Sequence, residues 1–314
     1  MSNIDRVLRS NLKLKHLQLL VALDEFRHLG KAAEFLSVTQ PAVSKTLAEI
    51  ERLVGFPLFE RSTRGSVPTA YGESLIRFAR SVLAGYERTR DEIAAVASGA
   101  AGRVSVGAMV VATPVLLTRA VELLKQRSPQ TRVLVEEGDL ARLLPKLRLG
   151  ELDLFIGRLE PGYAAPDLEA EALYNEPMTV VTRPDDPLAR KSRPAWKDLA
   201  GVPIVMPPPW ASLRVKLDQL FVGHGMEPPT DIIETASFLA TMAFVRQRSA
   251  VAFLARSVAR QFEREGAIKV LRMSVPVELP AVGIITLRSR RKTPTSEAMI
   301  ECVRRAARTS QAIK

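Results

Sequence analysis

Side chains that can read a DNA base recur at helical spacing between residues 39 and 48. At about 100° per residue, one face of a helix in this stretch carries Gln40, Pro41, Ser44, Lys45 and Ala48. The opposite face carries Val43, Leu47, Ile50 and Val54, which must be buried. A glutamine can pair bidentately with adenine, and a lysine can reach guanine or a phosphate. The free face therefore suits insertion into the major groove of DNA, and the alternative is an ordinary helical hairpin with a solvated polar face.

Neighbouring segments would position this helix. Thr39 is a good N-cap, and Pro41 falls in the first turn, where proline is tolerated. A short helix over residues 30–37 precedes it, and an amphipathic helix near residues 14–26 could complete a three-helix core. The segment that follows resembles a β-wing, where arginines bind phosphate or enter the minor groove. The tip of this wing carries Arg61, Ser62, Thr63 and Arg64.

These pieces together resemble the winged helix-turn-helix of LysR-type transcriptional regulators. The resemblance covers residues 14–72 and rests on three motifs in order, LKHLQLLVALDE, KAAEFLSVTQPAVSKTLAEIE and LFERSTRGSVPTAYGE. VTQPAVSKTLAEIE and LDLFIGRLE are similar to the galactose-binding-protein-regulator branch. The resemblance implies DNA contacts from Lys31, Thr39 and Pro41 as well. His28-Leu29-Gly30 departs from the Ser-Phe-Thr frequent in the family, so the start of that helix is expected to contact DNA somewhat differently.

Residues 69–98 predict one long helix with a heptad seam. The seam residues recur at alternating spacings of four and three: Leu75, Ala79, Val82, Tyr86, Thr89, Ile93 and Val96. Such a seam packs either against its own domain or against the same helix of a second chain. The resemblance implies the second arrangement, a dimer that presents two recognition helices to a two-fold DNA site. It further implies assembly into a tetramer.

The rest of the chain predicts an α/β fold. Strands and helices alternate after the small, flexible stretch 98–102, which indicates mostly parallel sheets. The fold class expected is a helix-rich winged helix-turn-helix, a long linker helix and a two-lobed effector domain similar to periplasmic binding proteins. The domains expected are residues 1–72, 73–98 and 99–314. Within the last, one lobe would comprise about 100–160 with 270–314, and the other about 163–268.

A small-molecule site is expected where strands lead into helices in the two lobes. Ligands of open α/β sheets bind outside the carboxyl ends of the strands, and free N–H groups at helix starts favour anions or polyols. Arg158 ends the most apolar strand and either clamps a carboxylate or pairs with Glu136, Glu137 or Asp139. An N-cap is most often only an N-cap, but these junctions lie where the family binds effectors. The candidates are Met109, Thr113, Arg158, Trp210, Ser212, Thr235, Ser237 and Phe238.

Bulk properties are those of a cytoplasmic globular protein. The 314 residues are 46% hydrophobic and 25% charged, the beginning of the chain lacks an apolar signal core, and the longest uncharged run, 104–118, is too short to span a membrane. The single Cys302 excludes an internal disulfide framework and any multi-cysteine zinc site. The net charge of +11 does not locate the nucleic-acid site, because residues 1–98 carry only 14 Lys and Arg against 11 Asp and Glu.

The sequence therefore predicts a DNA-binding transcriptional regulator. Its partners would be double-stranded DNA, a small-molecule effector that is a sugar or a carboxylated metabolite, further copies of itself and, at a promoter, RNA polymerase. We expect no cofactor, no metal site, no catalytic residue and no membrane partner, because P-loop, GxGxxG and HExxH motifs are all missing from the sequence. The alternatives are an architectural DNA-binding protein without effector and, less favoured, a small-molecule enzyme of α/β fold.

Overall fold

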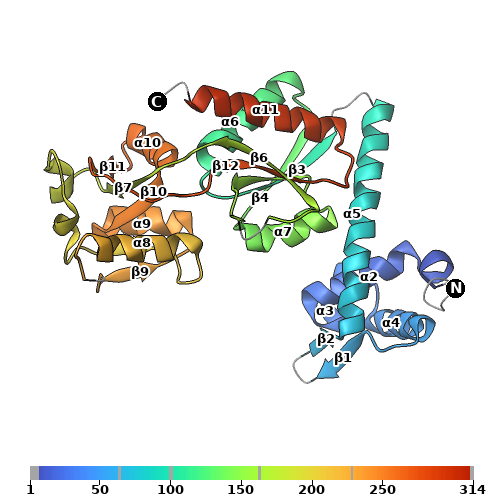
Figure 1. Ribbon diagram of the computed structural model, residues 1–314. Coiled ribbons are helices and arrows are strands. Elements are labelled where there is room, and N and C mark those ends of the chain that lie inside the picture. Colours follow the sequence, from blue (N-terminus) through green and yellow to red (C-terminus); the bar gives the residue numbers. More distant parts are fainter. Residues whose placement is uncertain (1–6, 63–64, 99–101, 162–163, 228, 312–314) are drawn as a thin grey trace. The chain divides into compact units, whose positions relative to one another are not determined.

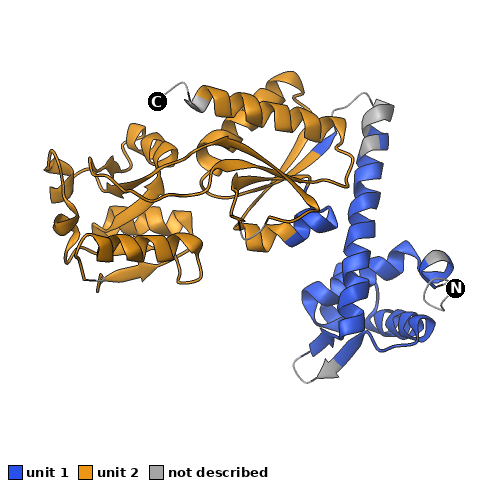
Figure 2. Cartoon of the chain, in the orientation of Figure 1, with its two compact units in different colours: residues 1–103, 145–152 blue, residues 104–144, 153–314 orange. Residues whose placement is uncertain are grey.

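The computed structural model describes residues 7–62, 65–98, 102–161, 164–227 and 229–311. The chain divides into two compact units (Figure 2). One comprises residues 1–103 with 145–152, and the other comprises residues 104–144 with 153–314. Among the described helices, none is long and apolar enough to cross a membrane.

The first unit begins with a small helical domain and a two-stranded wing (Figure 1). Its elements are a turn of π-helix η1 (Val7–Asn11), α2 (Leu14–Phe26), α3 (Leu29–Phe35), α4 (Gln40–Val54), β1 (Phe59–Ser62) and β2 (Gly65–Pro68). The apolar face expected for α4 is buried: Val43, Leu47, Ile50 and Val54 are all at most 6% exposed. They share one core with Leu20 and Leu23 of α2 and with Ala32 and Ala33 of α3. The three-helix core is therefore built from the periodicities read in the sequence.

The long helix α5 (Ala70–Ser98) packs against α2 through part of the expected seam. Ala79 is fully buried in the core of its own domain, and Leu75 and Val82 are partly buried against that core. Tyr86 and Ile93 are 49% and 64% exposed, and the side chain of Val96 lies outside the described part. The expectation of one continuous intermolecular seam is therefore wrong for its first half, because Leu75, Ala79 and Val82 pack against the core of their own chain.

The first lobe of the second unit contains a five-stranded sheet in the order β4-β3-β5-β12-β6. Strands β3 and β5 are parallel, and β12 is antiparallel to both β5 and β6. The strands are β3 (Arg103–Ala108), β4 (Arg132–Glu137), β5 (Leu154–Arg158), β6 (Leu168–Tyr174) and β12 (Val282–Leu287). The helices that accompany them are η2 (Thr113–Leu117), α6 (Thr118–Arg127), α7 (Leu140–Leu149) and α11 (Pro294–Gln311). Every residue of β5 and β12 is buried, which explains their apolar sequences.

The second lobe contains another five-stranded sheet, in the order β11-β7-β10-β8-β9. Its strands are β7 (Met178–Thr182), β8 (Ile204–Met206), β9 (Ile232–Glu234), β10 (Val251–Ala255) and β11 (Lys269–Val270). Its helices are η4 (Pro187–Arg190), η5 (Trp196–Leu199), α8 (Ser212–Gly223), α9 (Phe238–Arg248) and α10 (Arg256–Arg264). Strands β8, β9 and β10 are parallel, whereas β7 and β11 are antiparallel to their neighbours.

One lobe boundary differs from the expected one. The expected second lobe began near residue 163, but β6 pairs with β12 in the sheet of the first lobe. The chain therefore passes between the lobes twice, through residues 175–177 and through residues 271–281. The sequence of β6, LEAEALY, has one buried residue, Leu168, and nothing in it indicates which of the two sheets the strand joins. The domain boundaries themselves stay a prediction.

Candidate DNA-binding and effector-binding sites

The exposed face of α4 carries the side chains expected to contact DNA. Gln40, Pro41 and Lys45 are exposed, and Ser44 is half-buried. Thr39 caps the helix, because its Oγ1 accepts a hydrogen bond from the Ala42 N–H at 3.4 Å. At the other end, Gly55 adopts a left-handed conformation (φ 85°) that terminates the helix. The helix is thus fixed at both ends and along its buried face, and its donors face outward.

The start of α3 contains a cap that sequence reasoning had only noticed as a departure from the family. The His28 imidazole Nδ1 accepts hydrogen bonds from the Gly30 and Lys31 N–H groups at 3.1 and 3.4 Å. A serine or threonine normally fills this role. Lys31 itself is exposed. The histidine therefore preserves the geometry of the helix-turn-helix while it changes the chemistry of its edge.

The wing is anchored at three points to the helical core. Glu51 Oε1 accepts hydrogen bonds from the Leu58 and Phe59 N–H groups at 2.7 and 3.3 Å. The Ser66 N–H donates to the Arg27 carbonyl at 2.8 Å, and Thr69 caps α5 by accepting from the Gly72 N–H at 3.1 Å. Arg61 and Ser62 form the end of β1, but their side chains are not described, and Thr63 and Arg64 lie outside the described residues.

Two expected effector residues of the first lobe form one turn after β3. The Met109 N–H donates to the Ile156 carbonyl at 2.9 Å. The Thr113 N–H and Oγ1 both bond to the Met109 carbonyl, at 3.2 and 3.1 Å. Thr113 was expected to be an N-cap with free N–H groups after it, but it is the first residue of η2 and Ala112 is the cap. Its own N–H is therefore satisfied within the chain.

Arg158 occupies neither of the two arrangements expected for it. The side chain is only 6% exposed, and its Nη1 and Nη2 donate to the carbonyls of Pro280 and Glu176, both at 2.9 Å. These carbonyls belong to the two segments that cross between the lobes. Burial lowers the pKa of Arg158, and the nearby Glu176 carboxylate opposes this shift. The guanidinium is thus a main-chain donor at the lobe junction, paired with neither Glu136, Glu137 nor Asp139.

The expected residues of the second lobe are divided between local caps and the lobe junction. Ser237 caps α9 by accepting from the Ala240 N–H at 3.2 Å, and Thr235 Oγ1 accepts from the Ser237 N–H at 3.0 Å. Phe238 is half-buried and packs on Phe262 of α10, with ring centroids 5.2 Å apart. Trp210 is 79% exposed. Thr235 and Ser237 therefore serve chiefly as ordinary helix caps.

Ser212 makes a contact between the lobes that sequence reasoning missed. Its Oγ donates to Glu160 Oε1 at 2.8 Å, across 52 residues of chain. Glu160 follows β5 in the first lobe, whereas Ser212 begins α8 in the second. Glu160 is the last residue of the LDLFIGRLE signature, so the motif held a signal that its chemistry did not reveal. A second carboxylate at the junction, Glu176, accepts from the Ser257 N–H at the start of α10 at 2.9 Å.

A winged helix-turn-helix followed by two α/β lobes defines the class of ligand-responsive DNA-binding proteins. The family model for the LysR substrate binding domain matches residues 97–308. The model for the bacterial regulatory helix-turn-helix protein, lysR family, matches residues 14–73. The chain therefore belongs to the LysR family of transcriptional regulators.

Relatives and solved structures agree with this assignment. The chain is 32% identical over 303 residues to the HTH-type transcriptional regulator GbpR of Azospirillum brasilense, over 96% of this chain and 89% of that one. It is 29% identical over 291 residues to the HTH-type transcriptional regulator GalR of Pseudomonas putida, over 92% and 73%. Both are regulators, which agrees with the branch indicated by the motifs and rules out the enzyme alternative.

The fold is that of full-length LysR regulators. The structure of CbnR matches with a TM-score of 0.73 and 22% identity, covering 94% of this chain and 99% of that one. CbnR complexed with its target DNA matches with a TM-score of 0.71 over 94% and 100%. The fold class expected from the sequence is confirmed.

Proposed function

We propose that this LysR-family regulator binds a specific operator through α4. We propose further that a small hydroxyl-bearing effector, bound at the lobe junction, regulates this activity. Gln40, Ser44 and Lys45 would contact base edges in the major groove, with Thr39 and Pro41 beside the backbone. Lys31 and the wing residues Arg61, Ser62, Thr63 and Arg64 would contact phosphates or the minor groove. The protein would act in the cytoplasm and, at promoters, alongside RNA polymerase.

The DNA-binding proposal rests on the difference in burial between the two faces of α4. Its inner face is at most 6% exposed, and its outer face presents Gln40 and Lys45 without any apolar cover. Because the buried face, the cap and the wing anchors all fix the helix, its side chains would reach DNA without reorganising the domain. An architectural protein would gain nothing from the large two-lobed domain that follows.

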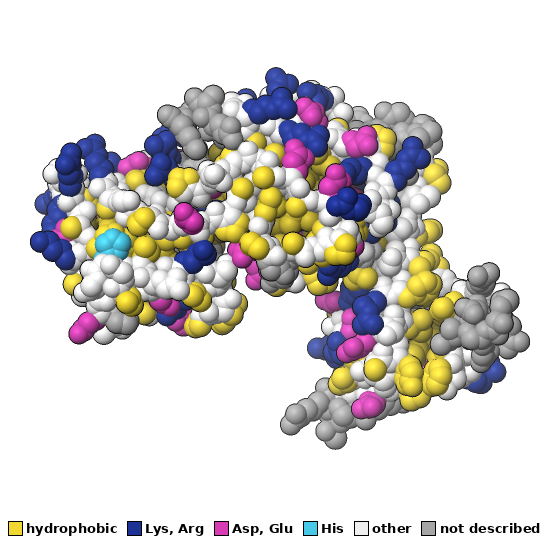
Figure 3. Space-filling view, in the orientation of Figure 1, with side chains coloured by type: hydrophobic (Ala, Val, Ile, Leu, Met, Phe, Trp, Pro, Cys, Tyr) yellow, Lys and Arg dark blue, Asp and Glu magenta, His cyan; other side chains and the backbone are white. Residues whose placement is uncertain are grey.

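Self-association would use an exposed stripe of α5. Tyr71, Phe78, Tyr86 and Ile93 are 55%, 39%, 49% and 64% exposed. At 100° per residue they fall within an arc of about 80° on the helix. Figure 3 shows hydrophobic side chains along α5. A dimer formed along this stripe, and a tetramer of two dimers, would present paired recognition helices to a two-fold operator.

The lining of the lobe junction favours a polyol such as a sugar over a carboxylate. The one arginine that ends β5 is fully engaged with main-chain carbonyls, so it offers no cationic clamp. Glu160 contributes a carboxylate, which accepts from hydroxyl groups and repels anions. A hydroxyl-bearing effector could take over the bond that Ser212 makes to Glu160. The two lobe arrangements would then differ in affinity for the effector, as regulation requires.

Base reading is tested by comparing Gln40→Ala with Gln18→Ala. Both glutamines are exposed, but Gln18 lies on α2 away from the outer face of α4. DNA fragments selected by the purified protein would supply the operator. We expect Gln40→Ala to weaken operator binding by about 1–3 kcal/mol and to leave random DNA unaffected. Gln18→Ala should match the wild type in both. Unchanged discrimination in Gln40→Ala would overturn the groove assignment.

Effector chemistry is tested by a thermal-shift screen of neutral sugars against sugar acids of the same carbon skeleton. The proposal expects stabilisation by a neutral sugar that is lost in Glu160→Gln and retained in the exposed control Glu227→Gln. Stabilisation by sugar acids alone would refute it. A sugar that binds equally to wild type and Glu160→Gln would place the effector elsewhere.

A further inference from the structure

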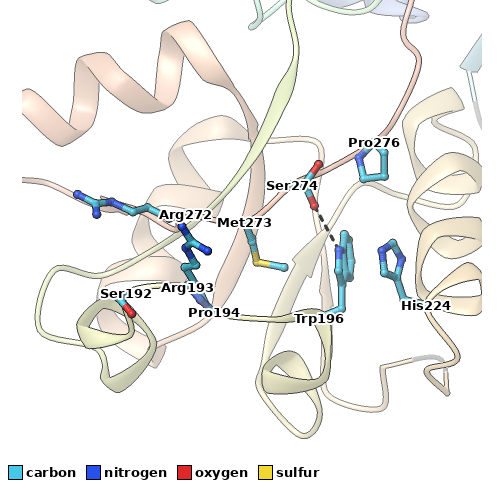
Figure 4. A pocket seen from close by; sticks show the side chains of 9 residues that line it. All are labelled: Ser192, Arg193, Pro194, Trp196, His224, Arg272, Met273, Ser274 and Pro276. Atoms are coloured by element: carbon cyan, nitrogen blue, oxygen red, sulfur yellow. Dashed lines mark hydrogen bonds between the residues drawn. The ribbon is translucent and has the colours of Figure 1, made fainter.

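The second lobe has a hollow whose lining includes neither Arg158 nor the Ser212–Glu160 pair of the lobe junction. It measures about 590 Å³ and is formed by three segments: the loop between η4 and η5, the end of α8, and the stretch after β11. Figure 4 shows Arg193 and Arg272 on one side of it, Trp196 and His224 on the other, and Met273 between them. Hollows of this size are typical of small-molecule sites.

The aromatic side of the hollow is rigid. Trp196 is 9% exposed and its Nε1–H donates to the Ser274 carbonyl at 3.2 Å (Figure 4). The His224 ring stacks on the indole with centroids 4.4 Å apart and planes at 24°. The Phe221 ring meets the indole edge-on at 5.5 Å and 90°. His224 is held in turn, because its Nδ1 lies 2.8 Å from the Leu220 carbonyl. A ligand would meet a surface that is already ordered, which lowers the entropic cost of binding.

The opposite side of the hollow carries positive charge that the chain does not neutralise. Arg193 and Arg272 are exposed, and neither has an ion-pair or hydrogen-bond partner among the described residues. Arg214 of the same lobe, by contrast, is paired with Asp218 and Glu234. The carboxylate closest in sequence, Asp198, is occupied by Lys191 at 2.8 Å and by the Ala195 N–H. Figure 3 shows Lys and Arg side chains gathered at this end of the lobe.

We propose that this hollow is a second small-molecule site, for an organic anion that carries a carboxylate or a phosphate on an apolar, ring-bearing body. Guanidinium groups match the paired oxygens of both anions, and the field of two cations with no carboxylate beside them favours negative charge. Met273 and Pro276, beside the edge of the largely buried Trp196, offer apolar area to the body of the ligand. Its lining includes Arg272 and Met273 of the crossing segment but none of Arg158, Glu160 and Ser212. The anion site therefore does not depend on the effector assignment above.

The test uses the fluorescence of Trp196. The chain has two tryptophans, and in a Trp210→Phe background the remaining one lines the hollow. The full-length protein is titrated with phenyl phosphate, benzoate, inorganic phosphate and the neutral benzyl alcohol, with calorimetry as a second readout. We expect saturable binding of phenyl phosphate or benzoate, and the tighter of the two identifies the anionic group. Inorganic phosphate should bind more weakly, and benzyl alcohol should not saturate.

The variant pair Arg193→Gln with Arg272→Gln should weaken binding of the preferred anion by about tenfold or more, as expected for lost charge-assisted hydrogen bonds. A control that removes two exposed arginines from α10 of the same lobe, Arg260→Gln with Arg264→Gln, should bind like the parent. Thermal unfolding would verify that both are folded. The proposal is overturned if no probe binds saturably, if the first pair binds like the parent, or if the control loses binding equally.

Discussion

Replacement of Arg158 by Met should destabilise the lobe junction while leaving the DNA-binding domain intact. The guanidinium is 6% exposed and donates at 2.9 Å to carbonyls that lie 18 and 122 residues further along the chain. Those carbonyls belong to the two segments that cross between lobes. Methionine fills much of the same space but has no donor, so the variant isolates the hydrogen bonds from the packing.

The magnitude follows from the two bonds. A hydrogen bond from a charged donor contributes about 1.5–3 kcal/mol, so two of them would contribute about 3–6 kcal/mol. Burying the charge costs part of this gain, as the lowered pKa of Arg158 indicates. We therefore expect Arg158→Met to reduce the free energy of unfolding by about 3 kcal/mol, a shift of roughly 6–12 °C in Tm for a domain of this size.

Urea unfolding followed by tryptophan fluorescence measures this effect cleanly. Both tryptophans, Trp196 and Trp210, lie in the second unit, so emission reports on that unit alone. Arg264→Met, a change at an exposed arginine of α10, is the control and should stay within about 0.5 kcal/mol of the parent. Operator binding without effector should persist in both variants. A loss in Arg158→Met no larger than that of the control would refute the role assigned to the two carbonyl bonds.

Three further predictions concern the first unit. Ile93→Asp should dissociate the dimer in sedimentation velocity, whereas Arg77→Asp, on the other side of α5, should not; a wild-type mass for Ile93→Asp would refute the stripe. Burial lowers the pKa of His16 below 6.5, so its unfolded form takes up a proton first. The free energy of unfolding should then fall as pH drops below about 6.5, by up to about 1.4 kcal/mol per pH unit, and His16→Gln should remove this slope in circular dichroism melts. Gly72→Ala should destabilise the domain, because a Cβ there overlaps the Leu58 carbonyl next to β1. Gly85→Ala should stabilise α5 by up to about 1 kcal/mol, because a Cβ there meets only Arg88 Nη2, at 3.9 Å; equal melting points would contradict this contrast.

The recognition helix was predictable because its determinants are local. The cap, the proline and the four buried residues of α4 all lie within 16 positions of one another, and helical periodicity alone relates them. The parallel order of β3 and β5 likewise follows from the alternation of strands and helices. Segments of this kind need no knowledge of distant partners.

The features that escaped sequence reasoning depend on contacts between distant residues. Arg158 was expected to face a ligand or a carboxylate, but its partners are main-chain carbonyls, which every residue has and which no sequence pattern marks. The seam of α5 was expected to pair with the same helix of a second chain, yet Ala79 packs in the core of its own helical domain. The cap at His28 was seen only as a departure, because an imidazole rarely replaces a serine there. In each case the sequence indicated what the side chain can do, but not which group in the folded chain it contacts.

The two contacts at the lobe junction differ in strength, and this difference bears on how an effector could act. Arg158 binds main-chain oxygens through buried, charged bonds, so it would keep the crossing segments in place whether or not a ligand is present. The bond from Ser212 to the Glu160 carboxylate is exposed, and competition from water holds it at or below the lower end of the about 1.5–3 kcal/mol that a hydrogen bond to a charged group contributes. A ligand at a hundred times its Kd, specific for one arrangement, supplies about 2.7 kcal/mol. An effector can therefore outweigh the Ser212 bond without disturbing the Arg158 bonds, which would let the lobes rearrange about a fixed connection.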